Sequence, residues 1–401
     1  MDDVRIGVIG NGLRGPLARL AHRPGEGAAV VAVADLHEDN LARARQWYGD
    51  GVLTTTRYQD LLEGAATDAV FVLSPDHLHE EHACAALSAG RAVFLEKPMA
   101  ISVESADRVL STAASTGSLL YVGHNMRHFD YLVVMKSMID RGDIGEVKAV
   151  WCRHFVGHGG DFYFRDWHAD RRYANTLLLQ KGAHDIDVIH WLAGGYSRAV
   201  QAFGQSAVYA HSTNRRQGPP KPPPAWTEED LVRHWPPRSL PGVNPVVDVE
   251  DISLVQMELD NGVLATYDQC HFTPDYWRNY TVIGDSGRLE NFGNGEPGTC
   301  VRLWDRRCGY EPEGHVKVVP PTGRGSHGGA DQRCVDEFLS LVSSGGTTAS
   351  VNSPIAARQA VATACAASSS LRAGGGVRTV EPVAPELDAA LAAYGRRRPE
   401  A

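Results

Sequence analysis

The first half of the chain alternates short apolar runs with helical patterns, and this alternation limits the possible folds more than any other feature of the sequence. The apolar runs span residues 4–9, 29–34, 69–73, 92–95 and 119–123. They show no regular alternation of polar and apolar residues, so both faces of each strand are expected to be buried. Strands of this kind, separated by helices, predict a parallel sheet covered by helices on both faces.

After Gly123 the pattern changes to longer runs in which polar and apolar residues alternate. Alternation of this kind is typical of an antiparallel or mixed sheet. The runs span residues 147–155, 199–209, 252–259, 263–272, 280–283 and 316–319. Asn261 and Gly262 tolerate positive φ and therefore predict a hairpin between two of these runs.

Charge, cysteines and apolar segments exclude several classes of protein. A formal net charge of −9 repels nucleic acid, so no nucleic-acid partner is expected. No apolar run approaches the roughly 18 residues that cross a bilayer, and the first residues lack the pattern of an export signal. Seven scattered cysteines without a C-x-x-C pair indicate reduced thiols rather than disulfides or a metal site. We expect a cytoplasmic protein with no membrane segment and no bound metal.

A glycine turn, Gly10-Asn11-Gly12-Leu13-Arg14-Gly15, separates the first apolar run from a helical pattern. Gly10 would permit the tight turn, Gly12 the approach of a pyrophosphate and Gly15 close packing of helix on strand. Asp35 follows Gly15 by twenty residues at a strand end, where a carboxylate accepts hydrogen bonds from the adenosine ribose. Together these features predict dinucleotide binding through the six residues of the turn and Asp35.

The choice between NAD and NADP rests on the residues at and after Asp35. NAD is favoured, because Asp35 repels a 2′-phosphate and Leu36 supplies no cation beside it. His37 leaves NADP open.

Four further motifs follow in order along the chain. They are Ser74-Pro75-Asp76-His77-Leu78-His79, Glu96-Lys97-Pro98, Gly123-His124-Asn125-Met126-Arg127, and Gly182-Ala183-His184-Asp185-Ile186-Asp187 before Trp191-Leu192. On these motifs the chain resembles the glucose-fructose oxidoreductase / inositol dehydrogenase / rhizopine-catabolism (Gfo/Idh/MocA) family over nearly its whole length.

The resemblance implies an α/β fold in which an N-terminal Rossmann parallel sheet is joined to a C-terminal α/β domain with an open, predominantly antiparallel sheet. The substrate then lies over the nicotinamide between the two. We therefore expect an NAD-binding domain at residues 1–123, a substrate-binding and oligomerisation domain at 124–385, and a C-terminal tail at 386–401. Nine prolines and two tryptophans mark residues 218–245 as a surface excursion, either a lid or a subunit-contact arm. A homo-oligomer, dimer or tetramer, is expected because the family buries the exposed face of its open sheet against another subunit.

Transfer of a hydride from a secondary alcohol requires a nicotinamide, a base for the hydroxyl proton and a group that stabilises the developing alkoxide. Lys97 follows an apolar run and so projects from the carboxyl edge of the parallel sheet, where a flexible cation can hold the reacting oxygen. A histidine with a pKa of about 6.5 suits acid–base work near neutrality, and the family pattern gives His184 that role.

The chain departs from the family four residues before His184. Many members carry an aspartate there, whereas this chain has Gln180, which cannot carry a proton away. We expect Lys181 or Asp187 to take over orientation or charge stabilisation, although each is equally well a structural or helix-surface residue. The catalytic candidates are therefore Lys97, His184, Lys181 and Asp187.

Further residues are assigned to ligands by the resemblance or by their chemical type. The resemblance adds as cofactor-binding residues Ser74, Pro75, His77, His79, Glu96, Lys97 and Asn125. The residues expected to bind the substrate are Lys97, Asn125, Arg127, Tyr163, Arg165, Trp167, His168, Gln180, His184 and His327. The loop from Tyr163 to His168 can stack on a sugar ring, or it can pack on its own domain.

Three functions remain open. The first is an NAD-dependent oxidoreductase acting on a secondary hydroxyl or keto carbon of a sugar, polyol or glycoside, with His184 as acid or base and Lys97 on the reacting oxygen. The second is a redox-neutral glycosidase or lyase with tightly bound NAD and a transient keto-sugar. The third is a non-catalytic dinucleotide-sensing regulator. Loss of Lys97 or His184 would be expected in such a regulator, and both residues are present.

Overall fold

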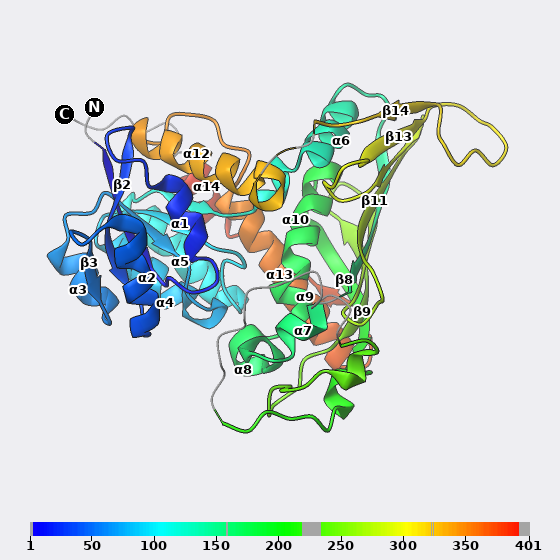
Figure 1. Ribbon diagram of the computed structural model, residues 1–401. Coiled ribbons are helices and arrows are strands. Elements are labelled where there is room, and N and C mark those ends of the chain that lie inside the picture. The colour runs from blue at the N-terminus through cyan, green and yellow to red at the C-terminus, as the bar shows by residue number, and fades with distance from the viewer. Residues whose placement is uncertain (1–2, 158, 219–233, 322, 324, 393–401) are drawn as a thin grey trace. The chain divides into compact units, whose positions relative to one another are not determined.

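The computed structural model describes residues 3–157, 159–218, 234–321, 323 and 325–392. The chain divides into two compact units (Figure 1). Unit 1 comprises Met1–Phe129, Gly323–Val361 and Pro382–Ala401, and unit 2 comprises Asp130–Thr322 and Ala362–Glu381.

Unit 1 contains a six-stranded, fully parallel sheet of order β3-β2-β1-β4-β5-β6. Its strands are β1 (Val4–Ile9), β2 (Ala28–Ala34), β3 (Leu53–Thr55), β4 (Ala69–Val72), β5 (Ala92–Leu95) and β6 (Leu120–Val122). Its helices are α1 (Gly15–Ala21), α2 (Glu38–Tyr48), α3 (Tyr58–Gly64), η1 (Asp76–Leu78), α4 (His79–Ser88), α5 (Val103–Thr116), η2 (Asn125–His128), η6 (Ser326–Gly329), α12 (Ala330–Ser343) and α14 (Pro385–Ala392). The parallel sheet expected from the uninterrupted apolar runs is confirmed.

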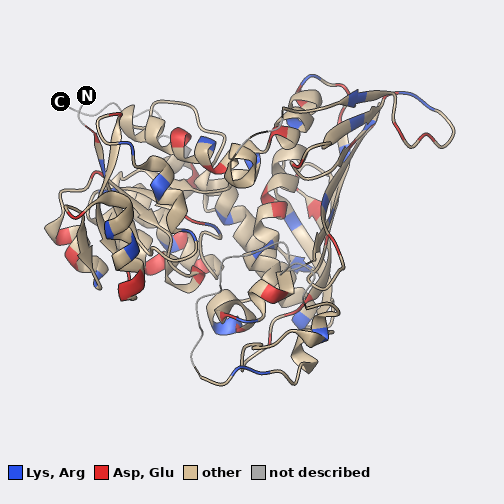
Figure 2. Ribbon diagram, in the orientation of Figure 1, with Lys and Arg blue, Asp and Glu red and all other residues tan. Residues whose placement is uncertain are grey.

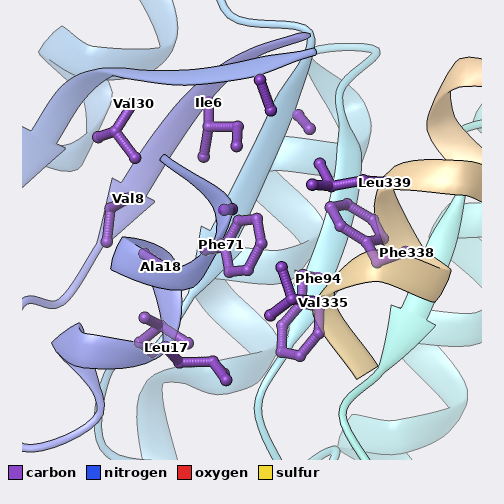
Figure 3. Close-up of a cluster of buried hydrophobic side chains, with 14 of the residues drawn as sticks. Ile6, Val8, Leu17, Ala18, Val30, Phe71, Phe94, Val335, Phe338 and Leu339 are labelled. Carbon is purple, nitrogen blue, oxygen red and sulfur yellow. The ribbon is translucent and has the colours of Figure 1, made fainter. Parts of the chain in front are cut away.

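Three aromatic rings at the centre of unit 1 tie a late helix to this sheet (Figure 3). Phe71 of β4 and Phe94 of β5 stack with ring centroids 4.7 Å apart. Phe338 of α12 meets their rings edge-on at 5.4 and 5.5 Å. All three side chains are buried, and burial of such a side chain contributes roughly 1.5–3 kcal/mol. Helix α12 is therefore part of the core of unit 1.

The units differ from the domains expected from the sequence. Residues 323–361 were expected in the second domain, but they belong to unit 1 because α12 buries its apolar face in that core. The observed division also falls after Phe129 rather than after Gly123. Helix α13 (Pro354–Arg372) begins in unit 1 and ends in unit 2.

Unit 2 contains a nine-stranded sheet of order β14-β13-β12-β11-β7-β10-β9-β8-β15. Its strands are β7 (Val147–Val156), β8 (Ser197–Gln205), β9 (Ile252–Leu259), β10 (Leu264–Cys270), β11 (Tyr276–Gly284), β12 (Arg288–Phe292), β13 (Cys300–Trp304), β14 (Val316–Val318) and β15 (Arg378–Thr379). Only β7 and β10 pair in parallel, and the other neighbouring strands are antiparallel. The open, predominantly antiparallel sheet is confirmed, and β12, β13 and β15 are additional to the runs that the sequence predicted.

Helices of unit 2 pack on one face of this sheet, with α10 crossing β7 and β10 (Figure 1). They are α6 (Asp130–Asp140), α7 (Gly159–Tyr163), η3 (Trp167–Ala169), α8 (Arg171–Ala174), α9 (Leu177–Gln180), α10 (Gly182–Ala193), η4 (Tyr209–His211) and η5 (Pro237–Ser239). The hairpin between β9 and β10 turns at Asn261 and Gly262 as expected, and Gly262 has a φ of 84°. Most of the proline-rich excursion, residues 219–233, lies outside the described residues.

Figure 2 shows Lys and Arg interspersed with Asp and Glu along the described parts of both units. All seven cysteines are free. No helix in the described part of the chain is long and apolar enough to cross a membrane.

Candidate functional site

The glycine turn leaves β1 and enters α1, and its glycines face different surroundings. Gly10 has a φ of 92°, and a Cβ there would lie 2.8 Å from the backbone nitrogen of Ser74. A Cβ on Gly12 would meet no protein atom closer than the side-chain nitrogen of Asn40 at 4.0 Å. The fold therefore requires glycine at position 10, whereas the space beside Gly12 is open to a ligand, as a dinucleotide-binding turn needs.

Asp35, at the end of β2, lies directly beside this turn. One carboxylate oxygen accepts the backbone N–H of Asn11 at 2.7 Å, and the other accepts the N–H of His37 at 2.9 Å and the Asn40 side chain at 3.0 Å. The sequence-predicted ribose acceptor and the turn thus form one structure. These contacts and the open space at Gly12 fit a bound dinucleotide.

Arg43 of α2 is a cation near Asp35 that the sequence analysis did not consider. Its guanidinium donates to the backbone oxygen of Asn11 and, at 2.8 Å, to the Asn40 side chain, which also binds Asp35. It lies over the ring of Trp47 at 5.3 Å. No sequence motif marks this residue, because it approaches the turn from the second helical turn of α2.

The turns after β4 and β5 carry most of the other predicted cofactor residues. His79 is buried, with one ring nitrogen 2.9 Å from the Ser74 oxygen and the other 2.7 Å from the Pro98 oxygen. Burial lowers the pKa of His79. The Lys97–Pro98 bond is cis. His79 thus joins the Ser74-Pro75 turn to the turn that carries Lys97, while the ligand roles of Ser74, Pro75, His77 and His79 stay predictions.

Asp331, the second residue of α12, collects four of the predicted site segments in unit 1. Its carboxylate accepts hydrogen bonds from Asn125 at 2.6 Å, from His327 at 2.9 Å and from Arg14 at 3.3 Å. Arg14 also binds Glu96 at 2.6 Å. Burial alone would raise the pKa of Asp331, but the bonds from His327, Arg14 and Asn125 outweigh it and hold that pKa well below its usual range.

Asp331 is therefore a further candidate site residue, at the end of a segment from which the sequence analysis selected only His327. The only available signal was its place at the end of His327-Gly328-Gly329-Ala330-Asp331, just inside a helix. Arg127, a predicted substrate residue, donates to the Val351 backbone oxygen at 2.7 Å in the same unit. Its substrate role stays a prediction.

In unit 2 the junction of α9 and α10 carries the other predicted catalytic residues. Gln180 ends α9, Lys181 follows it, and His184 and Asp187 lie in the first two turns of α10. His184 and Asp187 are both buried, so Asp187 does not lie on a solvent-exposed face of the helix. The catalytic roles of Lys181, His184 and Asp187 and the substrate-binding role of Gln180 remain predictions.

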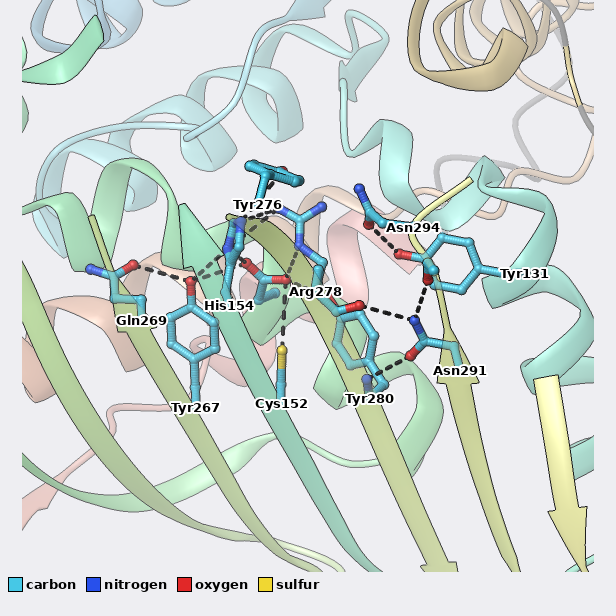
Figure 4. Close-up of polar contacts among 12 residues, drawn as sticks. Tyr131, Cys152, His154, Tyr267, Gln269, Tyr276, Arg278, Tyr280, Asn291 and Asn294 are labelled. Atoms are coloured by element: carbon cyan, nitrogen blue, oxygen red, sulfur yellow. Dashed lines mark hydrogen bonds and ion pairs between the residues drawn. The ribbon is translucent and has the colours of Figure 1, made fainter. Parts of the chain in front are cut away.

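Asp185, next to His184, is the centre of a buried polar network between α10 and the sheet (Figure 4). It pairs with Arg278 of β11 at 2.8 Å and His154 of β7 at 3.0 Å, and it accepts the hydroxyls of Tyr267 at 3.0 Å and of Tyr280. Burial raises the pKa of Asp185, but Arg278 and His154 more than reverse this effect. The network fixes the backbone of α10 at the position of His184.

The proton positions in this network follow from its partners. Burial, together with the charge of Arg278, lowers the pKa of His154 to about 3, so the ring is neutral near pH 7. Its Nδ1 then carries the hydrogen that is donated to Asp185, and its Nε2 accepts from Arg278 at 3.2 Å.

Gln269 and His271 are two further polar side chains on the α10-facing side of unit 2. Both are buried, and they follow Tyr267 at alternate positions of the same strand run. Gln269 accepts the Tyr267 hydroxyl at 3.1 Å, but its amide nitrogen has no hydrogen-bond partner among the described residues. Neither ring nitrogen of His271 has a hydrogen-bond partner among the described residues. Burial lowers the pKa of His271 well below its usual range.

The loop from Tyr163 to His168, which is predicted to stack on a sugar ring, contacts His271 through Tyr163. The rings of Trp167 and His168 stack at 3.7 Å, and Tyr163 meets His168 at 5.2 Å and His271 at 5.4 Å. Arg165 instead donates to the Pro241 backbone oxygen at 2.9 Å. The sequence found the loop but missed Gln269 and His271, which only the alternation of the run at 263–272 could have indicated.

Comparisons with known families cover most of the chain. A model described as an oxidoreductase family with an NAD-binding Rossmann fold matches residues 4–124, and a model of the GFO/IDH/MocA C-terminal domain matches residues 132–290.

Curated relatives include two inositol 2-dehydrogenases. That of Klebsiella pneumoniae (strain 342) is 34% identical over 213 residues, which cover 52% of this chain and 60% of the relative. Inositol 2-dehydrogenase 3 of Saccharopolyspora erythraea is 35% identical over 193 residues, 47% of this chain and 53% of the relative. The chain thus matches between half and two thirds of the length of these relatives.

Solved structures share the fold over nearly the whole chain. Levoglucosan dehydrogenase in complex with NADH and levoglucosan has a TM-score of 0.75 at 18% identity, covering 94% of this chain and 100% of that one. The myo-inositol 2-dehydrogenase of Lactobacillus plantarum has a TM-score of 0.68 at 20% identity, covering 95% and 100%.

Proposed function

Because this chain belongs to the Gfo/Idh/MocA family of NAD-binding oxidoreductases, we propose that it is an NAD-dependent dehydrogenase of a polyol or sugar. One observation carries the proposal: Glu96 binds both the glycine turn, through Arg14 at 2.6 Å, and the backbone N–H of Lys97 at 2.8 Å. The backbone of Lys97, the residue proposed to hold the reacting oxygen, is thereby connected to the turn proposed to hold the cofactor.

Each protein group has one role in the proposed reaction. A bound NAD would supply the acceptor for the hydride of the carbinol carbon. The Lys97 ammonium holds the hydroxyl oxygen and stabilises its negative charge as the proton leaves. His184 takes that proton, so that the alcohol loses one hydride and one proton and becomes a ketone. The Asp185 network keeps α10, and with it His184, in place.

A neutral polyhydroxylated ring is the substrate class that we propose. His154 and His271 have lowered pKa values and are neutral near pH 7, and Gln269 is uncharged. The Gln269 amide nitrogen and both ring nitrogens of His271 have no hydrogen-bond partner among the described residues, so these groups can bind ring hydroxyls, and leaving them unpaired costs free energy. The relatives named inositol 2-dehydrogenase make cyclitols the first class to test.

NAD is the proposed cofactor, because Asp35 would accept the ribose hydroxyls and repel a 2′-phosphate. Arg43 lies close enough to bear on this choice, since it shares Asn40 with Asp35. Titration of NADH and NADPH by nicotinamide fluorescence tests it. Tighter binding of NADH, with an Arg43→Met variant that keeps this preference, supports the assignment, and tighter binding of NADPH contradicts it.

The activity test is a panel of inositols, free sugars and glycosides incubated with enzyme and NAD, with NADH absorbance and sugar products followed in parallel. We expect NADH to accumulate with a cyclitol or sugar and to be lost in Lys97→Met and His184→Ala. Sugar release without NADH would instead identify the redox-neutral reaction, which Gln180 in place of an aspartate keeps as the alternative. NADH binding without any product would favour the dinucleotide sensor.

A further inference from the structure

We propose that Asp331 is a positioning residue for the reaction, acting on Lys97 through Arg14 and Glu96. The inference rests on the proposed function, because it takes Lys97 as the group that holds the reacting oxygen. Asp331 does not itself need to touch substrate or cofactor.

The first step of the connection is the contact between Glu96 and Lys97. Glu96 is buried, and its Oε2 accepts the Lys97 backbone N–H at 2.8 Å. Its Oε1 accepts the Nε of Arg14 at 2.6 Å. Because both carboxylate oxygens are engaged, the orientation of Glu96 fixes the start of the turn from which Lys97 extends.

The second step is the placement of Arg14 between two carboxylates. Its guanidinium binds Glu96 on one side and, at 3.3 and 3.5 Å, both oxygens of Asp331 on the other. Burial alone would lower the pKa of Arg14, but Glu96 and Asp331 reverse this effect and raise it. Loss of Asp331 would leave a largely buried guanidinium with Glu96 as its one carboxylate, so Arg14 and Glu96 would be free to shift together.

The third step is the anchoring of Asp331 itself. It lies in the first turn of α12, and Phe338 further along that helix is buried against the central sheet of unit 1. Its carboxylate is also held by Ser326 at 2.7 Å, by His327 at 2.9 Å and by Asn125 at 2.6 Å. A rigid helix therefore sets the position of Arg14, and the same carboxylate sets that of Asn125.

The experiment compares Asp331→Asn with Asp336→Asn, a matched control on the same helix. Asp336 forms an exposed pair with Arg23 at 2.8 Å, so its loss removes an α12 carboxylate without touching Arg14. For each variant, kcat and the two KM values are measured with NAD and the panel substrate that gives the fastest NADH formation. The affinity for NADH, the melting temperature and the rate at which acetic anhydride labels Lys97, followed by mass spectrometry, are measured on the same samples.

We expect Asp331→Asn to lower kcat about 10- to 100-fold, the cost of a small misplacement of a reacting group, with the affinity for NADH nearly unchanged. The labelling rate of Lys97 should change while that of the exposed Lys148 does not, and Asp331→Glu should recover part of kcat. Arg14→Met combined with Asp331→Asn should be little worse than the more damaging single variant, because both act through one connection. Asp336→Asn should match the wild type.

Four results would overturn the proposal. An Asp331→Asn enzyme with lower melting temperature but wild-type kcat and Lys97 labelling would make Asp331 purely structural. Weaker NADH binding with unchanged kcat would make it a cofactor-binding residue. Wild-type kcat in Lys97→Met would refute the proposed role of Lys97, and this inference with it, whereas an inactive Lys97→Met beside a fully active Asp331→Asn would refute the positioning role alone.

Discussion

His271 shows how a single buried residue couples this fold to pH. The side chain is fully buried beside Tyr163, and burial lowers its pKa far below the value of about 6.5 that it has in an unfolded chain. Well above pH 6.5 neither state binds the proton, so His271 adds no pH dependence of stability there. As the pH falls below about 6.5 the unfolded chain binds a proton that the folded chain does not, and stability is lost.

We therefore predict that His271→Phe flattens the pH dependence of stability between about pH 7.5 and 5.5. The free energy of unfolding should fall less steeply in the variant, by up to about 1.4 kcal/mol per pH unit, the value for one proton. Urea unfolding at several pH values measures the free energy of unfolding of each protein. His211→Phe, which replaces an exposed histidine of the same unit, is the control. Equal slopes in the wild type and His271→Phe would contradict the assignment.

Residues that lie in motifs could be predicted from the sequence, and residues that meet only in space could not. Gly10, Asp35, Lys97 and His184 are identified by local spacing, because their neighbours in the chain define the pattern. Asp331 lies 317 positions from Arg14, and no local pattern records that contact. Gln269 and His271 depend likewise on which face of β10 meets α10.

The glycine turn allows a test at the level of one element, since two of its glycines are required for different reasons. An alanine at Gly12 meets open space, so Gly12→Ala should fold and melt like the wild type. It should weaken NADH binding about tenfold or more, because a clash of about 1.4 kcal/mol with the pyrophosphate suffices. Isothermal titration with NADH and a thermal melt check both statements, and unchanged affinity would show that no ligand approaches Gly12.

Gly10→Ala is the matched control on the same turn. Its Cβ would strike the backbone at Ser74 in a left-handed conformation, so this variant should lose stability itself, by more than about 1 kcal/mol. A melting temperature equal to that of the wild type would contradict this account of the turn.

At the element scale, long alternating patterns in the second half of the chain predicted strands well, whereas three short strands of the same sheet were missed. The runs that became β7, β9 and β10 alternate clearly over seven or more residues. β12 and β13 are five residues each, and β15 is two, which is too short for alternation to stand out from loop sequence. Such short strands form because neighbouring strands supply their hydrogen-bond partners. Those partners come from other parts of the sequence, so the short segment alone does not predict the strand.

The whole molecule carries an exposed apolar face on the nine-stranded sheet. Trp151, Phe203, Leu254 and Leu264 are each about half exposed or more, and Phe203 pairs with Leu254 across β8 and β9. These side chains lie on one face of the sheet, interspersed with polar residues such as Gln256 and Thr266, and exposed apolar groups gathered on one face are typical of an interface. We predict a homo-oligomer that buries it.

Replacing Phe203 and Leu254 together by lysine should lower the molar mass measured by light scattering from that of an oligomer to that of the monomer. Leu36→Lys, at a still more exposed leucine in unit 1, should leave the mass unchanged. A monomeric wild type, or a double variant that keeps the wild-type mass, would refute the interface.

The sequence could predict that two sheets would form, but not which core would receive each helix after residue 322. An amphipathic helix such as α12 can cover either sheet, because its apolar residues show which face of the helix is buried but not which sheet that face packs on. Phe338 could meet Phe71 and Phe94 only once the parallel sheet had formed, and this explains why residues 323–361 lie in unit 1.

The central claim is hydride transfer from a substrate carbon to NAD, and isotope transfer tests it most directly. The substrate that the panel identifies is prepared with deuterium on its carbinol carbons. The mass of the NADH formed is then measured by mass spectrometry. The account predicts NADH that carries one deuterium, formed much more slowly by Lys97→Met and His184→Ala. Unlabelled NADH, or a substrate converted while NAD stays unreduced at the end, would contradict it.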